Sequence, residues 1–383
     1  MEPSPVSKLW EQFAQLEDPR VARARRHELL DIIIIAVCGV ICGADSWVDI
    51  EEFGKAKLDW FGSFLDLPNG IPSHDTFGRV FARLNPEGFQ RCFLAWAEAL
   101  QEGTQGKLVA LDGKTLRRSH DQARGKSALH LLSAWASENH LVLGQRKVEG
   151  HSNEITAIPA LLDLLALEGC TVTIDAMGTQ KEIARQVKER GADYVLALKG
   201  NQGRLYQEVA ESFQEGRKAE FAGIAHDRQE TVNGGHGRVE VRRYWTIFDP
   251  EYLSYLDPKG KWAGLRSIGM VEAERHEGEK RTVETRYYLS SLAGNAREFG
   301  HAVRGHWDIE NGLHWVLDVA FREDESRVRT GYAQENLATL RRLALTLLRR
   351  EQNARVGVKA KRLKAGWSED YLLTVLTSKP TTS

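Results

Sequence analysis

Two aspartates in this chain occupy positions where a carboxylate could do chemistry. Asp112 ends the apolar run "LVALD", and Asp175 ends the run "TVTID". Such runs are typical of strands buried on both faces, and the ends of those strands are where α/β sheets place their ligands. Either aspartate alone could instead be a turn residue or a helix N-cap. Two aspartates in matching positions favour one shared site.

A third carboxylate lies in the segment "HWDIENGLHWVLDVAF" at 306–321, whose periodicity predicts a helix. The apolar stripe of this helix comprises Ile309, Leu313, Val316 and Ala320. Glu310 lies at the edge of the stripe, which is unfavourable for a charge unless a divalent cation compensates it. Asp112, Asp175 and Glu310 would then be oxygen ligands for Mg²⁺, for which Mn²⁺ could substitute. Two such ions can activate a nucleophile and stabilise the leaving oxygen during attack on phosphorus.

Other residues near Glu310 are weaker candidates. Asp318 lies eight residues further on, about 12 Å along a helix, which is too far to share one metal centre. Glu323 and Asp324 follow the expected helix end, and we expect them to cap it or to pair with Arg327 and Arg329. The two histidines of the region, His306 and His314, are eight residues apart and fit no standard zinc pattern.

Composition limits the class of protein. The chain has 383 residues, of which 42% are hydrophobic and 27% charged, so it should form two or three globular domains. The longest apolar run, at 32–44, is shorter than the roughly 20 residues of a membrane-spanning helix and predicts a buried core helix. Cys38 and Cys42 lie in this run and are expected to be structural thiols rather than a metal site or a disulfide. A reducing, cytoplasmic setting without membrane contact is therefore expected.

The charges are unevenly distributed along the chain. The formal net charge of −1 alone argues against a nucleic-acid partner, but residues 341–364 carry nine Lys or Arg and one Glu. This segment is either a solvated face or a surface for a polyanion. Basic residues also follow both strand-end motifs, with Lys114, Arg117 and Arg118 after Asp112, and Lys199 in "KGNQ".

The pattern of apolar residues changes along the chain and predicts an α/β protein with a mixed sheet. We expect five parts, in chain order: a helical N-terminal domain (1–102), the first part of an α/β core (103–215), a β-rich insertion (216–290), the second part of the core with the third acid (291–352) and a basic C-terminal tail (353–383).

Several ordered motifs resemble those of one family. The motifs are "LDGKTLRRS", "TIDAMGTQKEIA", "YVLALKGNQ", "HGRVEVRR" and "RGHWDIENGLHWVLDVAFREDESRVR". Together they resemble the DDE transposases of bacterial insertion sequences, in the ISAs-type branch that includes the H-repeat-associated proteins. The resemblance covers nearly the whole chain. It implies a ribonuclease H-like mixed-sheet core with a β-rich insertion, in which Asp112, Asp175 and Glu310 are the catalytic acids and bind two Mg²⁺ ions. It also implies an all-helical N-terminal domain that binds DNA.

The chain departs from the family pattern around the third acid. Related transposases carry a Tyr–Arg–Glu–Lys signature there, whereas the Tyr, Arg and Lys positions are Val303, His306 and Leu317 in this chain. The resemblance therefore implies that DNA phosphates are held by other residues. The candidates are Lys114, Arg117, Arg118, Lys199, Asn201, Arg238, Arg304, His306, Trp307 and Arg327.

The function that the resemblance implies is a transposase. It would bind double-stranded DNA at the ends of an insertion sequence and catalyse metal-dependent strand cleavage and strand transfer, as a homodimer on DNA, at the nucleoid of a bacterial cytoplasm. One alternative is a metal-dependent nuclease on the same core without strand transfer. Another is an inactive or domesticated copy that only binds DNA, although the presence of Asp112, Asp175 and Glu310 argues against it.

Overall fold

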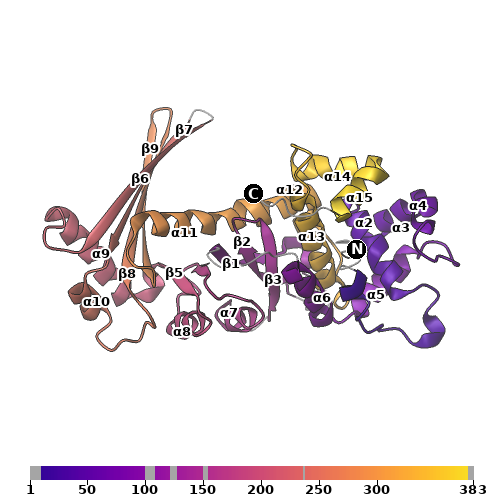
Figure 1. Cartoon of the computed structure of the whole chain (residues 1–383), viewed down its shortest axis with the longest axis horizontal. Coiled ribbons are helices and arrows are strands. Elements are labelled where there is room, and N and C mark those ends of the chain that lie inside the picture. The colour runs from indigo at the N-terminus through magenta and orange to yellow at the C-terminus, as the bar shows by residue number, and fades with distance from the viewer. Residues whose placement is uncertain (1–9, 100–107, 121–126, 150–153, 236–237, 378–383) are drawn as a thin grey trace.

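The computed structural model describes residues 10–99, 108–120, 127–149, 154–235 and 238–377, with side chains 97–99 excepted. The predicted boundary between residues 102 and 103 lies outside these ranges. The order of the elements along the chain follows the prediction: helices, then an α/β region, then a β-rich region, then helices again (Figure 1).

The N-terminal part is helical, as predicted. Its α-helices are α2 (Leu29–Ile41), α3 (Trp47–Ala56), α4 (Leu58–Gly62), α5 (His74–Arg83) and α6 (Pro86–Ala99). The longest apolar run forms α2, and every residue of α2 except Leu30 is buried. Cys38 is buried there, and all four cysteines are free thiols. Among the described residues, no helix has the length and apolar character to span a membrane.

The middle of the chain forms a mixed sheet. Its first strands are β1 (Leu108–Thr115), β2 (His130–Ala136), β3 (Leu141–Val148), β4 (Thr171–Ile174) and β5 (Asp193–Leu198). They lie in the order β3-β2-β1-β4-β5, with the first three antiparallel and β1, β4 and β5 parallel. The connecting helices are α7 (Glu154–Leu162), α8 (Lys181–Glu189) and α9 (Arg204–Lys218). The predicted ribonuclease H-like core is therefore confirmed.

The β-rich region extends the same sheet. Its elements are β6 (His226–Gly235), β7 (Arg238–Ile247), α10 (Pro250–Leu256), β8 (Ser267–Glu277) and β9 (Lys280–Ser290). Strand β9 pairs with β5, which gives one nine-stranded sheet rather than a separate one. The hairpin ends of these strands project from one end of the molecule (Figure 1).

A long helical segment then crosses the sheet. It comprises α11 (Ala296–Asp308), a π-helical turn (Ile309–His314), called the π turn below, and α12 (Trp315–Phe321). Gly305 allows α11 to approach β1 closely, because a Cβ on this residue would lie 1.9 Å from Leu108 Cδ2. The stripe predicted for this segment is buried, as expected.

The C-terminal residues differ from the predicted basic tail. They form α14 (Val358–Trp367) and α15 (Glu369–Thr377), which pack near α13 (Ala333–Arg350) and α2. Lys361 and Arg362 are buried, and Arg362 donates hydrogen bonds to the carbonyl oxygens of Val40 and Ala44. Arg362 thus satisfies carbonyl groups at the end of α2, and Lys361 satisfies those of Leu348 and Glu351 at the end of α13. Two of the four basic side chains of α14, those of Lys361 and Arg362, are therefore buried and bonded to the backbone of neighbouring segments.

Candidate catalytic site

The first two acids lie on neighbouring parallel strands. Leu111 of β1 pairs with Ile174 of β4, so Asp112 and Asp175 occupy the next positions at the same edge of the sheet. Asp112 is half-buried. Asp175 also stabilises its own turn, since its Oδ1 accepts hydrogen bonds from the backbone N–H groups of Met177 (3.0 Å) and Gly178 (3.3 Å). The turn role and a role in a shared site are compatible for Asp175.

The third acid reaches Asp112 from the π turn. Glu310 is exposed, and ligand atoms of Asp112, Glu310 and His314 all lie within 4.8 Å of one another. Within the described ranges, this is the one group of three or more acidic, histidine or cysteine side chains so arranged. Asp175 is outside the group of three. The structure thus brings together Asp112 and Glu310, which lie far apart in the sequence. It also adds His314, which was not predicted as a site residue.

The π turn has identifiable supports. Lys114 Nζ donates to the carbonyl oxygen of His314 at 3.1 Å, and Arg349 Nη2 donates to that of Gly312 at 2.7 Å. A π turn widens the helix, and side-chain donors can satisfy carbonyl groups in such irregular turns. The four-residue spacing from Glu310 to His314, which places both on one side of a helix, is the sequence signal that could have identified the histidine.

Burial and the two neighbouring histidines both affect the pKa of Asp112. Burial alone would raise the pKa of Asp112, but the neighbouring imidazoles of His314 and His306 outweigh it and the pKa falls below the usual value. Burial lowers the pKa of His306, although the Asp112 and Asp175 carboxylates act in the opposite direction. His306 also lies 3.0 Å from the Thr173 hydroxyl through Nδ1. Asp112 therefore stays ionised in a half-buried position.

Comparison with known proteins decides the family. Residues 103–347 match the family model described as Transposase DDE domain, and residues 10–97 match the one described as DDE_Tnp_1-associated. This chain belongs to the DDE transposases.

Whole-length relatives agree. The transposase is 41% identical to "Putative transposase YncI" of Escherichia coli O157:H7 over 97% of this chain and 95% of that protein. It is 38% identical to "H repeat-associated putative transposase YhhI" of Escherichia coli (strain K12) over 97% of this chain and 98% of the relative. A solved piggyBac transposase synaptic complex with hairpin DNA is 12% identical, with a TM-score of 0.43, over 99% of this chain and 80% of that one.

Lys114 of the transposase is enclosed in a network of ion pairs. Its ammonium group is buried and pairs with Asp318, and it lies 3.7 Å from Glu323. The carboxylate of Glu323 is fully buried and pairs with Arg342 at 2.8 Å. Burial would raise the pKa of Glu323, but Arg342 and the other nearby cations lower it instead. The phosphate contact expected for Lys114 is thus replaced by a structural network between β1, α12 and α13.

Asp324 also has a partner other than the expected one. It lies 3.4 Å from Arg117 Nε and accepts the Arg117 backbone N–H at 3.2 Å, rather than pairing with Arg327 or Arg329. The alternatives to Glu310, namely Asp318, Glu323 and Asp324, are therefore all occupied in ion pairs.

The remaining residues proposed for DNA lie at several places on the surface. The exposed ones are Arg117, Arg118, Lys199, Asn201, Arg238, Arg304, Trp307 and Arg327, and His306 is half-buried. Asn201 Nδ2 donates to the carbonyl oxygen of Ala176, which ties the loop after β5 to the Asp175 turn. Trp307 lies under the guanidinium group of Arg286, with 4.3 Å between the guanidinium carbon and the ring centroid. Arg238 lies at the outer end of the β6–β7 hairpin and does not join the carboxylates.

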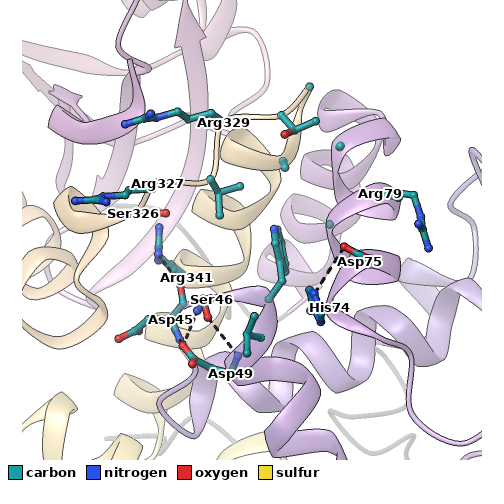
Figure 2. A pocket seen from close by; sticks show the side chains of 18 of the residues that line it. Asp45, Ser46, Asp49, His74, Asp75, Arg79, Ser326, Arg327, Arg329 and Arg341 are labelled. Atoms are coloured by element: carbon teal, nitrogen blue, oxygen red, sulfur yellow. Dashed lines mark hydrogen bonds and ion pairs between the residues drawn. The ribbon is translucent and has the colours of Figure 1, made fainter. Parts of the chain in front are cut away.

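A groove lined by basic residues lies between the helical end of the transposase and the segment after α12 (Figure 2). Its volume is about 850 Å³, and it lies between α3 and α5 on one side and residues 322–333 on the other. Six arginines line this arginine groove: Arg79, Arg83, Arg322, Arg327, Arg329 and Arg341. Two of its acids are already used, since Asp49 caps α3 and Glu325 pairs with Arg322. Of the six arginines, only Arg327 was among the residues predicted to bind DNA. The others could not be predicted, because the groove is formed by segments that are distant in the sequence.

Proposed function

We propose that this transposase binds the ends of an insertion sequence and catalyses metal-dependent DNA cleavage and strand transfer, with Asp112, Asp175 and Glu310 as its catalytic acids. The observation that carries the proposal is the convergence of Asp112 and Glu310, whose ligand atoms come within 4.8 Å although the residues belong to separate parts of the core. Asp175 supports it from the adjacent strand position.

The residues present fit divalent metal ions. Carboxylate oxygens are the ligands that Mg²⁺ and Mn²⁺ take in proteins, and Glu310 is exposed where a phosphodiester could also reach. When bound, such ions activate the attacking oxygen and stabilise the leaving oxygen. Asp112 contributes an ionised carboxylate, because its lowered pKa keeps it deprotonated at neutral pH.

DNA would be held by its phosphates. Arg117 and Arg118 follow β1 directly, and Arg329 donates to the carbonyl oxygen of Arg118, which connects this turn to the wall of the arginine groove. Phosphate contacts of this kind dominate nucleic-acid affinity. We further propose that a homodimer holds the two ends, that the N-terminal helices contact the DNA, and that the protein acts at the nucleoid.

The test is a cleavage and joining assay on DNA that carries the element ends. We expect cleaved and joined products with Mg²⁺ or Mn²⁺ and no products with EDTA or Ca²⁺, whose looser geometry suits chemistry poorly. Metal-dependent cleavage without joined products would instead identify a nuclease. Specific binding without any cleavage would identify an inactive copy, and full activity in EDTA would remove the metal from the proposal.

A further inference from the structure

His314 is buried in a way that ordinary packing does not explain. Its side chain is 3% exposed, and neither ring nitrogen makes a hydrogen bond of good geometry within the described residues. A buried polar group without a partner costs roughly 1–3 kcal/mol. Its Nε2 lies 3.3 Å from Asp112 Oδ2, so the unused nitrogen faces the candidate catalytic acids.

We propose that His314 is a direct ligand of the metal ion bound by Asp112 and Glu310, so that one of the two ions has a nitrogen donor. This inference rests on the metal site of the proposed function. The ligand atoms of the three residues lie within 4.8 Å of one another. Donor atoms around one ion with bonds of about 2.1 Å lie about 3–4 Å apart. A small inward movement would therefore bring all three onto one ion.

Strand β1 contacts both the side chain and the backbone of His314. Asp112 and Lys114 are two residues apart and lie on the same face of the strand. Asp112 faces the His314 ring, while Lys114 Nζ donates to the His314 carbonyl oxygen at 3.1 Å. The π turn, a feature that recurs at functional sites, therefore fixes the imidazole against the carboxylates.

An imidazole ligand changes the preferred metal. Imidazole suits transition metals better than Mg²⁺, and Mn²⁺ is the transition metal whose ligand preferences lie closest to those of Mg²⁺. The ion held by Asp112, Glu310 and His314 is therefore expected to be exchanged readily for Mn²⁺. His306, whose Nδ1 lies 3.0 Å from the Thr173 hydroxyl, provides a histidine of the same region for comparison.

The experiment measures metal binding without DNA. The full-length protein is titrated with Mn²⁺, and pulsed electron paramagnetic resonance detects the coupling of a directly bound ¹⁴N nucleus. We expect this coupling in the wild type and its loss in His314→Gln, with Mn²⁺ affinity lowered roughly tenfold or more. Glutamine can still donate a hydrogen bond to Asp112, so a merely positioning role would be retained. His306→Gln should keep the coupling, and circular dichroism should show both variants folded.

The possible failures are distinguishable. Bound Mn²⁺ without ¹⁴N coupling in the wild type would overturn the assignment of His314 and leave the carboxylate site intact. Coupling that survives His314→Gln, or that disappears only in His306→Gln, would also overturn it. If the wild type bound no Mn²⁺ at all, the ligand assignment and the metal dependence of the proposed function would both be wrong.

Discussion

Lys114 Nζ lies 3.1 Å from the carbonyl oxygen of His314, so the strand that carries Asp112 also holds the backbone of the turn that carries Glu310. The same ammonium group pairs with Asp318 on α12. Two segments about 200 residues apart are thereby fixed against each other at the point where the acids meet. This contact therefore helps to set the position of the Glu310 turn relative to Asp112.

Replacement of Lys114 should act on the fold rather than on phosphate binding. Lys114→Met removes the partner of Asp318 and one of the two cations beside buried Glu323, which keeps Arg342, and we expect unfolding to become easier by about 3 kcal/mol. Thermal denaturation measures this effect. At temperatures where the variant is folded, the salt dependence of DNA binding should be unchanged, whereas Arg118→Gln should reduce the slope of log K against log salt by about 0.9. A reduced slope for Lys114→Met would show that this lysine contacts DNA.

Glu323 is expected to be structural. Its carboxylate and the guanidinium group of Arg342 are both fully buried and 2.8 Å apart. Removal of one partner from such a pair destabilises a protein by about 3–5 kcal/mol, so Glu323→Gln should lower the midpoint of urea unfolding strongly. Glu325→Gln, which removes an exposed carboxylate paired with Arg322, should have a much smaller effect, because exposed ion pairs contribute little to stability. Equal effects of the two changes would contradict this interpretation of the buried network.

Asp31 should make the stability of the protein depend on pH. Burial and the carboxylates of Glu28 and Asp66 raise its pKa to about 6. Because the folded pKa is above the unfolded value, this residue favours folding when protonated, and that contribution is lost as the pH rises through about 6. Asp31→Asn should therefore raise stability at pH 8 by about 1–2 kcal/mol after allowance for solvent screening, and little at pH 4. Thermal unfolding at both pH values checks it, and an equal gain at both would argue against the raised pKa.

The arginine groove should contribute to DNA affinity through phosphate contacts. We expect the triple change of Arg79, Arg83 and Arg327 to glutamine to weaken binding of all sequences and to reduce the salt slope by about 0.9 for each lost contact. Lys218→Gln on α9, which lies at the opposite end of the molecule (Figure 1), is the matched control. Fluorescence anisotropy at several salt concentrations measures both. An unchanged slope in the triple variant would show that the groove does not bind DNA.

The strand-end acids could be predicted because their signal is local. Asp112 and Asp175 each follow a short apolar run, and the stripe around Glu310 is a property of one helix. The role of Lys114 could not be predicted, because its partners Asp318 and His314 lie about 200 residues away in the sequence. A cation beside an acidic strand end is equally compatible with a substrate contact and with a buried pair.

The C-terminal segment shows the same limit. Its charges predicted a solvated face or a surface for a polyanion, and four of its basic residues are Lys359, Lys361, Arg362 and Lys364. The structure instead uses Arg362 to bind the carbonyl oxygen of Val40 near the end of α2, so neutralising this arginine would destabilise the fold. Only Lys359 and Lys364 of the four are exposed. Tertiary packing decides whether a basic side chain is exposed to solvent or bonds to the end of a helix. Amino-acid composition alone therefore cannot predict it.

The most direct test of the central claim is cleavage of end-containing DNA by Glu310→Gln in Mg²⁺. The substitution is nearly isosteric and removes one exposed carboxylate from the group of Asp112, Glu310 and His314. We expect no detectable strand cleavage, with unchanged thermal stability and unchanged affinity for the ends. Asp324→Asn, which removes a partner of Arg117, should retain most of the activity. Cleavage by Glu310→Gln at the wild-type rate, with loss of cleavage in folded Asp324→Asn or Asp318→Asn, would contradict the assignment of Glu310 as the third catalytic acid.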